Sequence, residues 1–397
     1  MSPSKPNWVA VAVLLCFGLF LSTNVFSIAA IYAQIATNLS GNISGLGLLV
    51  SFYFIGRAGL EVPAGIFAGR VGPKKVAVLG GLLFSAAALL SSLAANLDLV
   101  IIARLVSGGA FGACFPQVMI LFVRNLPKGS SGLGSGLVIL MTTGVGAIFG
   151  LFGWAELSSA IGWRESLIVS GGLLLITTCV LARALEPDAA EVKQHVKPRL
   201  LLDFLLRKRL ILLALALMGM GGVIVLVSNF IIYYLQSSLG LSAGLAGLVG
   251  AMNPAFSLVA PLAGRGFDRY HDTRRWIAFA SLILAAGLAI VSIPHTTDAI
   301  VCVALVGVGQ GVGMTITYAS ARETAESAGE LEPIAVSWVD SISSIGPIVS
   351  APIFSLIVLE YGYSWGWLFG SVFVLAFTSP LLLFSSGTFA DSLAKRD

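Results

Sequence analysis

Long apolar runs follow one another along almost the whole chain, separated by short polar or glycine-rich stretches. A helix needs about 20 apolar residues to cross the hydrocarbon layer of a bilayer, and each run is about that long. The runs predict twelve transmembrane helices, at 8–33, 44–68, 75–94, 97–123, 130–155, 163–184, 209–236, 242–264, 275–293, 297–319, 333–358 and 363–386. Because the apolar residues run continuously instead of alternating, the pattern excludes a transmembrane β-barrel.

The composition indicates the same class of protein. Hydrophobic residues make up 57% of the chain and charged residues only 11%, whereas soluble domains carry about a quarter charged residues. We therefore predict an all-α membrane protein. The four cysteines lie inside apolar runs without metal-ligand spacing, so we expect buried thiols and no cofactor.

One long polar stretch divides the chain into two halves. It predicts an N-terminal six-helix bundle over 1–184, a cytoplasmic linker over 185–208 and a C-terminal six-helix bundle over 209–397. Of the 23 Lys and Arg residues, 20 fall on one side of these bundles, which the positive-inside rule makes the cytoplasm. We expect a multi-pass protein of the cell inner membrane with both termini cytoplasmic, and a net charge of +4 that reflects topology and not nucleic-acid binding.

Two loop segments at corresponding places in the halves share a pattern of glycine followed by basic residues. Residues 65–75 read GIFAGRVGPKK and residues 264–275 read GRGFDRYHDTRR, while helix four contributes RLVSGGAFG over 104–112. The residues that carry the two loop patterns are Gly65, Arg70, Gly72, Asp268 and Arg269. Together these segments resemble the signatures of the major facilitator superfamily, over nearly the whole chain.

The resemblance implies twelve helices in two pseudo-symmetric six-helix bundles that rock about a central site near the bilayer midplane. The acidic residue of the loop signature would latch the halves together on the cytoplasmic side. Gly69 stands where the family usually has Asp, so the latch of the first half is in doubt while Asp268 keeps that of the second. The fifth helix, TTGVGAIFG over 142–150, lacks the Gly-Pro step usual in antiporters of the family.

Four charged residues lie well within predicted helices: Arg57, Glu61, Arg104 and Asp340. A charge at the bilayer centre costs about 2.5–3.5 kcal/mol on insertion scales, so each should face a partner or a wet cavity. Arg57 and Glu61 lie four residues apart, hence on one helix face. The family packing of helices two and eleven predicts one cluster of Arg57, Glu61 and Asp340. The alternative is a structural salt bridge between Arg57 and one carboxylate.

With one cation and two carboxylates in such a cluster, both acids cannot stay ionised near neutral pH, so we expect one to bind the coupling proton. Arg104 is a candidate for binding an anionic group or for organising helix four. Other polar and aromatic residues could line a solute cavity or form interhelical hydrogen bonds: Asn24, Tyr53, Asn229, Tyr233, Gln310 and Trp338.

The function that these features predict is secondary-active transport by alternating access, with proton-coupled symport of a small organic solute, an anion being one candidate. Proton-driven efflux of apolar or cationic compounds is the second candidate, and a non-transporting sensor on the same fold is the alternative class. A membrane enzyme would need nucleophiles or metal ligands within the helices, whereas all three histidines fall in loops or the linker. The expected partners are a small-molecule substrate, protons and the lipid bilayer, and we expect a monomer.

Overall fold

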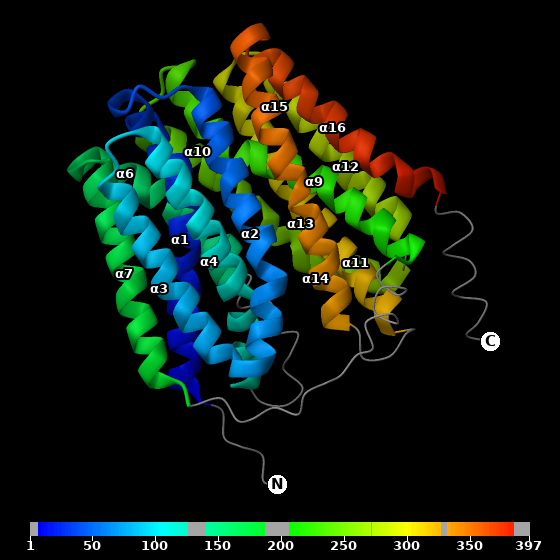
Figure 1. Cartoon of the computed structure of the whole chain (residues 1–397). Coiled ribbons are helices and arrows are strands. Elements are labelled where there is room, and N and C mark those ends of the chain that lie inside the picture. Colours follow the sequence, from blue (N-terminus) through cyan, green and yellow to red (C-terminus); the bar gives the residue numbers. More distant parts are fainter. Residues whose placement is uncertain (1–6, 126–139, 187–205, 271, 327–331, 385–397) are drawn as a thin grey trace, which may run out of the picture. The chain divides into compact units, whose positions relative to one another are not determined.

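The computed structural model of the chain describes residues 7–125, 140–186, 206–270, 272–326 and 332–384. All regular structure in these residues is helical, as Figure 1 shows. The elements are α1 (Trp8–Asn38), α2 (Ile43–Val71), α3 (Pro73–Ser92), α4 (Leu97–Arg124), the π-helices η1 (Leu140–Gly146) and η2 (Phe149–Gly153), α6 (Trp154–Ile161), α7 (Trp163–Ala184), α9 (Lys208–Ser237), α10 (Ala243–Phe256), the 3-10 turn η3 (Ser257–Val259), α11 (Ala260–Tyr270), α12 (Thr273–Val291), α13 (Thr296–Glu326), α14 (Glu332–Ser343), α15 (Ile345–Tyr361) and α16 (Tyr363–Phe384).

Twelve segments in the described part of the chain are long and apolar enough to cross a membrane, which confirms the predicted number of spans. Most of their ends fall within a few residues of the predicted ones. The fifth ends at Ile161, six residues beyond the predicted end at 155, and its predicted start at 130 lies outside the described residues. The eleventh is interrupted at Ser344, between α14 and α15, where we expected one continuous helix.

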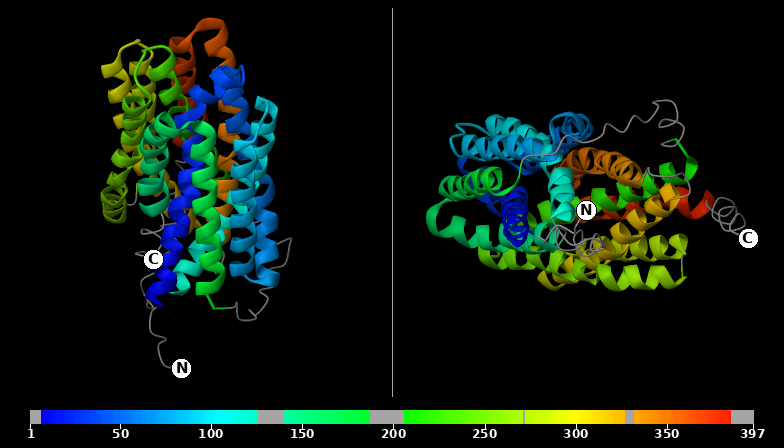
Figure 2. Two further views of the ribbon diagram at one scale, coloured as in Figure 1. Left: turned by 90° about the vertical axis from the view of Figure 1, so that its left-hand side faces the viewer. Right: turned by 90° about the horizontal axis from the view of Figure 1, so that it is seen from below.

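The chain forms two compact units. Unit 1 comprises Met1–Lys193 with Asn229–Pro254, and unit 2 comprises Gln194–Ser228 with Ala255–Asp397. In unit 1, the dark blue α1 and the green α7 run side by side in the left view of Figure 2. Buried apolar residues of α1, α3, α4 and α7 form the core between them, including Phe17, Phe84, Phe122 and Leu174. The division into six-helix halves at 185–208 stays a prediction.

A repeat of 200 residues is visible within the helices. Gly162 and Gly362 begin the sixth and twelfth spans with φ values of 95° and 88°, a left-handed backbone that favours glycine. Two residues further, Arg164 Nη1 donates to Ser92 O at 2.7 Å, and Ser364 Oγ donates to Ser292 O at 2.6 Å. Each bond joins the start of one helix to the end of another 72 residues earlier. A hydrogen bond thus joins equivalent helix ends in the two units, with a guanidinium as the donor in unit 1 and a hydroxyl in unit 2. We call each of these bonds a helix tie.

A hydrogen bond also joins the start of the third span to the end of the sixth. Lys74 Nζ, in the first turn of α3, donates to the carbonyl of Leu185, the residue that caps α7. The last carbonyls of a helix lack partners within the helix, and a lysine is a suitable donor to them. Lys74 thus binds a terminal carbonyl of α7 and not one of α2, the helix that it follows in the sequence.

Candidate functional site

Helices α2 and α4 lie in close contact along a seam of glycines. A Cβ at Gly108 would lie 1.8 Å from Tyr53 O, one at Gly56 would lie 2.0 Å from Leu105 O, and one at Gly112 would lie 2.7 Å from Arg57 O. Only glycine permits backbones to approach so closely, as at small-residue contacts of membrane helices generally. The glycines that follow Arg104 therefore allow α4 to pack directly against the backbone of α2. The neighbouring side chains of the two helices lie beside this line of contact, which we call the glycine seam.

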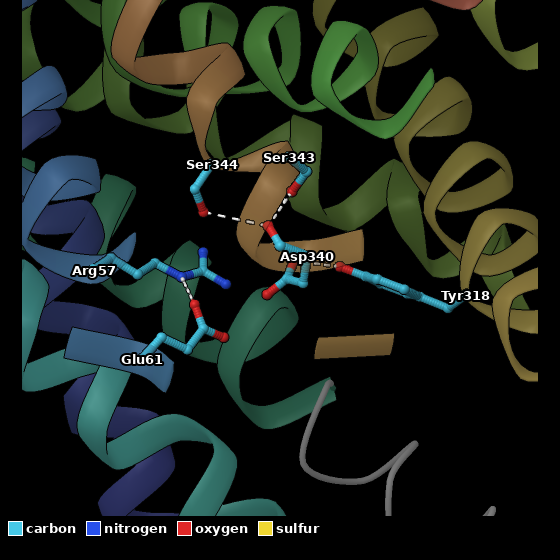
Figure 3. Close-up of polar contacts among 6 residues, drawn as sticks. All are labelled: Arg57, Glu61, Tyr318, Asp340, Ser343 and Ser344. Carbon is cyan, nitrogen blue, oxygen red and sulfur yellow. Dashed lines mark hydrogen bonds and ion pairs between the residues drawn. The ribbon is translucent and has the colours of Figure 1, made fainter. Parts of the chain in front are cut away.

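Arg57 projects from α2 where the two backbones touch. Its Nε lies 3.6 Å from Glu61 Oε2 on the next turn, and the side chains are 17% and 7% exposed (Figure 3). The guanidinium carbon lies 5.9 Å from the Phe54 ring centroid and 5.4 Å from that of Phe111. Both distances fall within the range of cation–π attraction. The predicted pairing of Arg57 with Glu61 is thus present, on a surface lined by aromatic rings.

Arg104 lies nearer the start of α4 and is 5% exposed. Its guanidinium carbon lies 4.4 Å from the Tyr53 ring centroid, so the cation stacks on the ring. Among the residues that the structure describes, Arg104 Nε and the Tyr53 hydroxyl have no hydrogen-bond partner. A buried guanidinium with an aromatic neighbour and no described carboxylate beside it can attract an anion.

Asn24 and Arg104 line one enclosed cavity in unit 1, together with Ser91, Ser107 and apolar residues of α1, α3 and α7. Its volume is about 10 Å³, the size of roughly one water molecule. Asn24 Nδ2 donates to Phe20 O and Ser170 O, which orients its Oδ1 as the remaining acceptor. An organic solute does not fit in this cavity. In this arrangement of the helices, Asn24 and Arg104 therefore line a space that is too small for a solute.

Asp340 lies near the end of α14 in unit 2. Its Oδ1 accepts a hydrogen bond of 2.7 Å from the Tyr318 hydroxyl on α13 (Figure 3). Its backbone carbonyl accepts from Ser343 Oγ at 2.6 Å, and Ser344 Oγ lies 3.4 Å from the same oxygen. The backbone ladder continues across Ser344, because Ser344 N donates to Asp340 O at 3.2 Å and Ile348 N donates to Ser344 O at 3.4 Å. The interruption between α14 and α15 is thus confined to Ser344. The carboxylate is therefore next to a discontinuity in its own helix.

The cluster of Arg57, Glu61 and Asp340 joins residues of different units and stays a prediction. Two further candidates, Gln310 and Trp338, each have a buried polar atom without a described partner, Oε1 and Nε1 respectively. Thr317, two turns after Gln310 on α13, donates to Gly313 O of its own helix. Tyr233 packs edge-on against Tyr32, with ring centroids 5.4 Å apart. Asn229, one turn earlier on α9, is partly buried.

The loop-signature residues are described only in part. Gly72 has φ 99° and links α2 directly to α3. A Cβ at Gly65 would meet nothing within 4 Å, so described packing does not require that glycine. Arg269 is exposed, with its guanidinium carbon 5.5 Å from the Tyr270 centroid. The side chains of Arg70 and Asp268 lie outside what the structure describes, and the latch stays a prediction.

Sequence reasoning missed three contributors to these sites: Tyr318, Phe54 and Phe111. The spacing of Phe54 and Phe111 from Arg57 carries no signal until the contact between α2 and α4 is known. Arg209 and Glu323 were also missed as a pair, with 3.4 Å between Nη2 and Oε2. They lie on α9 and α13, and no local pattern joins them. Among the described residues, no group of three His, Cys, Asp or Glu side chains could hold a metal ion.

The sequence of this chain is similar to those of known membrane transport proteins. The sequence model of the Major Facilitator Superfamily matches residues 12–331. A probable sulfoacetate transporter, SauU of Cupriavidus necator, is 30% identical over 35% of this chain and 32% of its own length. The 4-hydroxybenzoate transporter PcaK of Pseudomonas putida is 30% identical over 45% of this chain and 40% of its own. The matched part thus spans about a third of these relatives.

The fold has close counterparts among solved structures. A bacterial homologue of the human lysosomal transporter Spinster, inward-facing and unoccupied, has a TM-score of 0.77. The match covers 95% of this chain and 96% of that one at 14% sequence identity, which shows a shared fold. The family match over most of the chain, the twelve apolar helices and the shared fold lead to one conclusion. This chain belongs to the major facilitator superfamily and is a multi-pass membrane protein.

Proposed function

We propose that the protein transports a small organic anion across the inner membrane by alternating access, together with protons. The observation that carries this proposal is the charge balance inside unit 1. Its described spans contain two buried or nearly buried cations, Arg57 and Arg104, against one buried carboxylate, Glu61. Arg57 pairs with Glu61, whereas no described carboxylate lies beside the buried Arg104. A cation within the membrane is costly without a counter-charge, and an anionic solute would offset that cost.

The relatives support the same class of solute. SauU is named for sulfoacetate and PcaK for 4-hydroxybenzoate, and both compounds are small organic anions. The two differ in shape, since one is aliphatic and the other aromatic. We therefore propose only the class that both compounds share, small organic anions.

Coupling to protons follows from the ion pair of Arg57 and Glu61. A proton on Glu61 removes the negative charge beside Arg57, and the guanidinium then attracts the solute's carboxylate or sulfonate more strongly. Proton and anion thus favour each other's binding, which is the thermodynamic requirement of symport. Asp340 is the second candidate for the proton, because its carboxylate lies beside a helix break.

The test is uptake into vesicles that contain the purified protein, with an imposed proton gradient and 4-hydroxybenzoate or sulfoacetate as the solute. We expect Glu61→Gln or Asp340→Asn to abolish accumulation above the outside concentration while exchange of labelled for unlabelled solute continues. Glu323→Gln is the matched control, since it also removes a carboxylate that pairs with an arginine. It should accumulate solute as the wild type does.

Two outcomes would overturn the proposal. If both neutral variants are folded and accumulate solute with the wild-type dependence on pH, neither carboxylate couples transport to protons. If the wild type moves no organic anion but expels a lipophilic cation, efflux is the function. The cytoplasmic position of both termini, inferred from the distribution of Lys and Arg, is proposed on the same footing.

A further inference from the structure

We propose that a surface pocket between α1 and α7 binds the head group of a phospholipid that carries both a phosphate and an ammonium, as phosphatidylethanolamine does. In this site Arg164 binds the phosphate and Glu165 binds the ammonium. Neither residue takes part in the proposed transport of anions, so the inference does not depend on the identity of the transported solute.

The pocket lies where α1 ends and α7 begins, two helices of unit 1 that run side by side in the left view of Figure 2. Its volume is about 490 Å³, within the range of small-molecule sites. Its lining includes two amides, an aromatic ring and two charged side chains, namely Gln34, Asn38, Trp163, Arg164 and Glu165. A cation and a carboxylate thus share one pocket that is large enough for a head group.

Arg164 keeps hydrogen-bond donors for a phosphate. Its Nη1 donates to Ser92 O and Ala94 O at 2.7 and 2.8 Å, which leaves Nη2 and Nε without a partner among the described residues. The guanidinium carbon lies 4.3 Å from the centroid of the Trp163 ring, and no described carboxylate pairs with it. The cation is therefore held in position without being neutralised, and the planar guanidinium group matches the geometry of phosphate oxygens.

The rest of the pocket offers acceptors for an ammonium. Glu165 Oε2 lies 2.6 Å from where a Cβ on Gly162 would be, so the carboxylate is folded back over the start of α7. It has no hydrogen bond or ion pair with the described residues. Gln34 Nε2 donates to Ser158 Oγ and Asn38 Nδ2 donates to Gln34 O, so each amide keeps its side-chain oxygen as an acceptor. These acceptors suit a primary ammonium, in which every N–H can donate.

The equivalent position of unit 2 has a similar backbone without the charges. Gly362 has the same left-handed conformation, but the repeat of 200 residues places Ser364 and Trp365 at the positions of the charged pair. Ser364 forms the helix tie of unit 2, so a guanidinium is not required for that bond. The charges of unit 1 therefore serve a purpose beyond the tie, and a ligand with both signs of charge accounts for them.

The location favours a lipid over a soluble zwitterion. Trp163 and Arg164 lie in the first turn of α7, at the end of an apolar span, where aromatic and long basic side chains meet lipid head groups. Further along α7, Ile168 is 48% exposed and Ile176 is 60% exposed. Between them, a Cβ on Gly172 would meet no atom within 4 Å. An acyl chain can therefore lie along this apolar face while its head group enters the pocket.

The experiment is native mass spectrometry of the purified full-length protein, mixed in detergent with equal amounts of phosphatidylethanolamine, phosphatidylcholine and phosphatidylglycerol. All of these lipids carry the phosphate, but the ammonium of phosphatidylcholine has no N–H and phosphatidylglycerol has no ammonium. We expect the wild type to retain phosphatidylethanolamine as its first bound lipid in preference to the others by roughly 2- to 5-fold, the range for an exposed charge pair.

Two variants and a control locate this preference. Glu165→Gln leaves the bonds from Arg164 to the carbonyls in place, and it should lower retention of phosphatidylethanolamine to that of phosphatidylcholine. Arg164→Gln should weaken retention of every lipid in the mixture, because it removes the cation that meets the phosphate. Glu360→Gln is the matched control, since Glu360 is an exposed carboxylate near the equivalent helix end of unit 2, and it should retain lipids as the wild type does.

The thermal midpoint of each variant is measured in parallel, and if Arg164→Gln is unstable, Glu165→Gln decides alone. Loss of the preference in Glu165→Gln with a wild-type midpoint supports the site. Equal retention of the lipids by the wild type, or an unchanged preference in Glu165→Gln, overturns it. If soluble O-phosphoethanolamine displaces the lipid at equal concentration, the acyl chains contribute nothing and the assignment to a lipid is wrong. Uptake into vesicles tests the proposed transport of anions separately, so failure here leaves that proposal standing.

Discussion

The fifth helix of the first half and the eleventh span are equivalent in the repeat, and both depart from regular α-helix at the same place. In unit 1 the departure is a pair of π-helices, η1 and η2, and two carbonyls of η1 accept hydrogen bonds from hydroxyl groups of α1. In unit 2 it is a break at Ser344, where the helix's own serines bond to Asp340 O. The irregular position is shared, whereas the side chains that stabilise it are not.

The difference extends to charge. Leu140 begins η1, and Asp340 stands 200 residues later beside the break in unit 2. A rare feature such as a π-helix frequently marks a functional position. Both halves of the repeat thus contain an irregular helix at this position. Only the one in unit 2 has a titratable residue there, Asp340, where unit 1 has Leu140.

The largest loss of stability should come from substituting the glycines where these irregular helices contact their neighbours. A Cβ at Gly346 would lie 2.1 Å from Met218 O, whereas one at Gly146 would lie 2.8 Å from Ser22 Cβ and 2.9 Å from Leu19 O. Backbone must move in both cases, but much further in the first, so we expect Gly346→Ala to lower stability by about 3 kcal/mol and Gly146→Ala by about 1 kcal/mol. Thermal denaturation of the purified variants measures both.

Gly65→Ala is the control for these substitutions, because an added methyl there meets no atom within 4 Å. Alanine is the better helix former, so this variant should be as stable as the wild type or slightly more so. Equal losses in Gly346→Ala and Gly146→Ala would show that the two helix contacts do not differ as described.

A smaller effect should separate the two helix ties. Arg164 Nη1 donates to Ser92 O and Ala94 O at 2.7 and 2.8 Å, whereas Ser364 makes one neutral bond. Hydrogen bonds from a charged donor contribute about 1.5–3 kcal/mol and neutral ones about 0.5–1.5 kcal/mol. Arg164→Ala should therefore lower the thermal midpoint more than Ser364→Ala. The reverse order would mean that the cation is solvated and contributes little to the tie.

The smallest effect should come from the hydroxyl groups that contact η1. Ser22 Oγ donates to Thr142 O at 2.6 Å, and Thr23 Oγ1 lies 3.3 Å from Gly146 O. Hydrogen bonds between membrane helices average about 0.6 kcal/mol, so Ser22→Ala and Thr23→Val should each cost about that much. Hydrogen exchange of the amides in 140–153 should rise in both variants. In Ser350→Ala, which loses a bond to Gly222 O in unit 2, exchange over 140–153 should stay unchanged.

The helices were predictable because their signal is local. An apolar run of sufficient length specifies a membrane helix without reference to any other part of the chain, and all twelve runs did so. The pair of Arg57 and Glu61 was predictable for the same reason, since four residues of helix place two side chains on one face. The bond from Lys74 to Leu185 had no such local signal, because its partners are 111 residues apart in the sequence.

The rest depends on which helices touch. Tyr318 reaches Asp340 from another helix, and Phe111 meets Arg57 only because three glycines bring α2 against α4. The π-helices could not be predicted from residues 140–153, since the hydroxyl groups that bond to their carbonyls lie on α1.

The bond from Lys74 to Leu185 has a consequence for the order of events on the ribosome. Both partners precede the residues of the second half, so the bond can form while later spans are still being synthesised. Domains generally fold as units, with the N-terminal part first during synthesis. The carbonyl of Leu185 can therefore accept its hydrogen bond from Lys74 once the sixth span has been synthesised. The residues that follow are then added to a chain whose last helix is already held by α3.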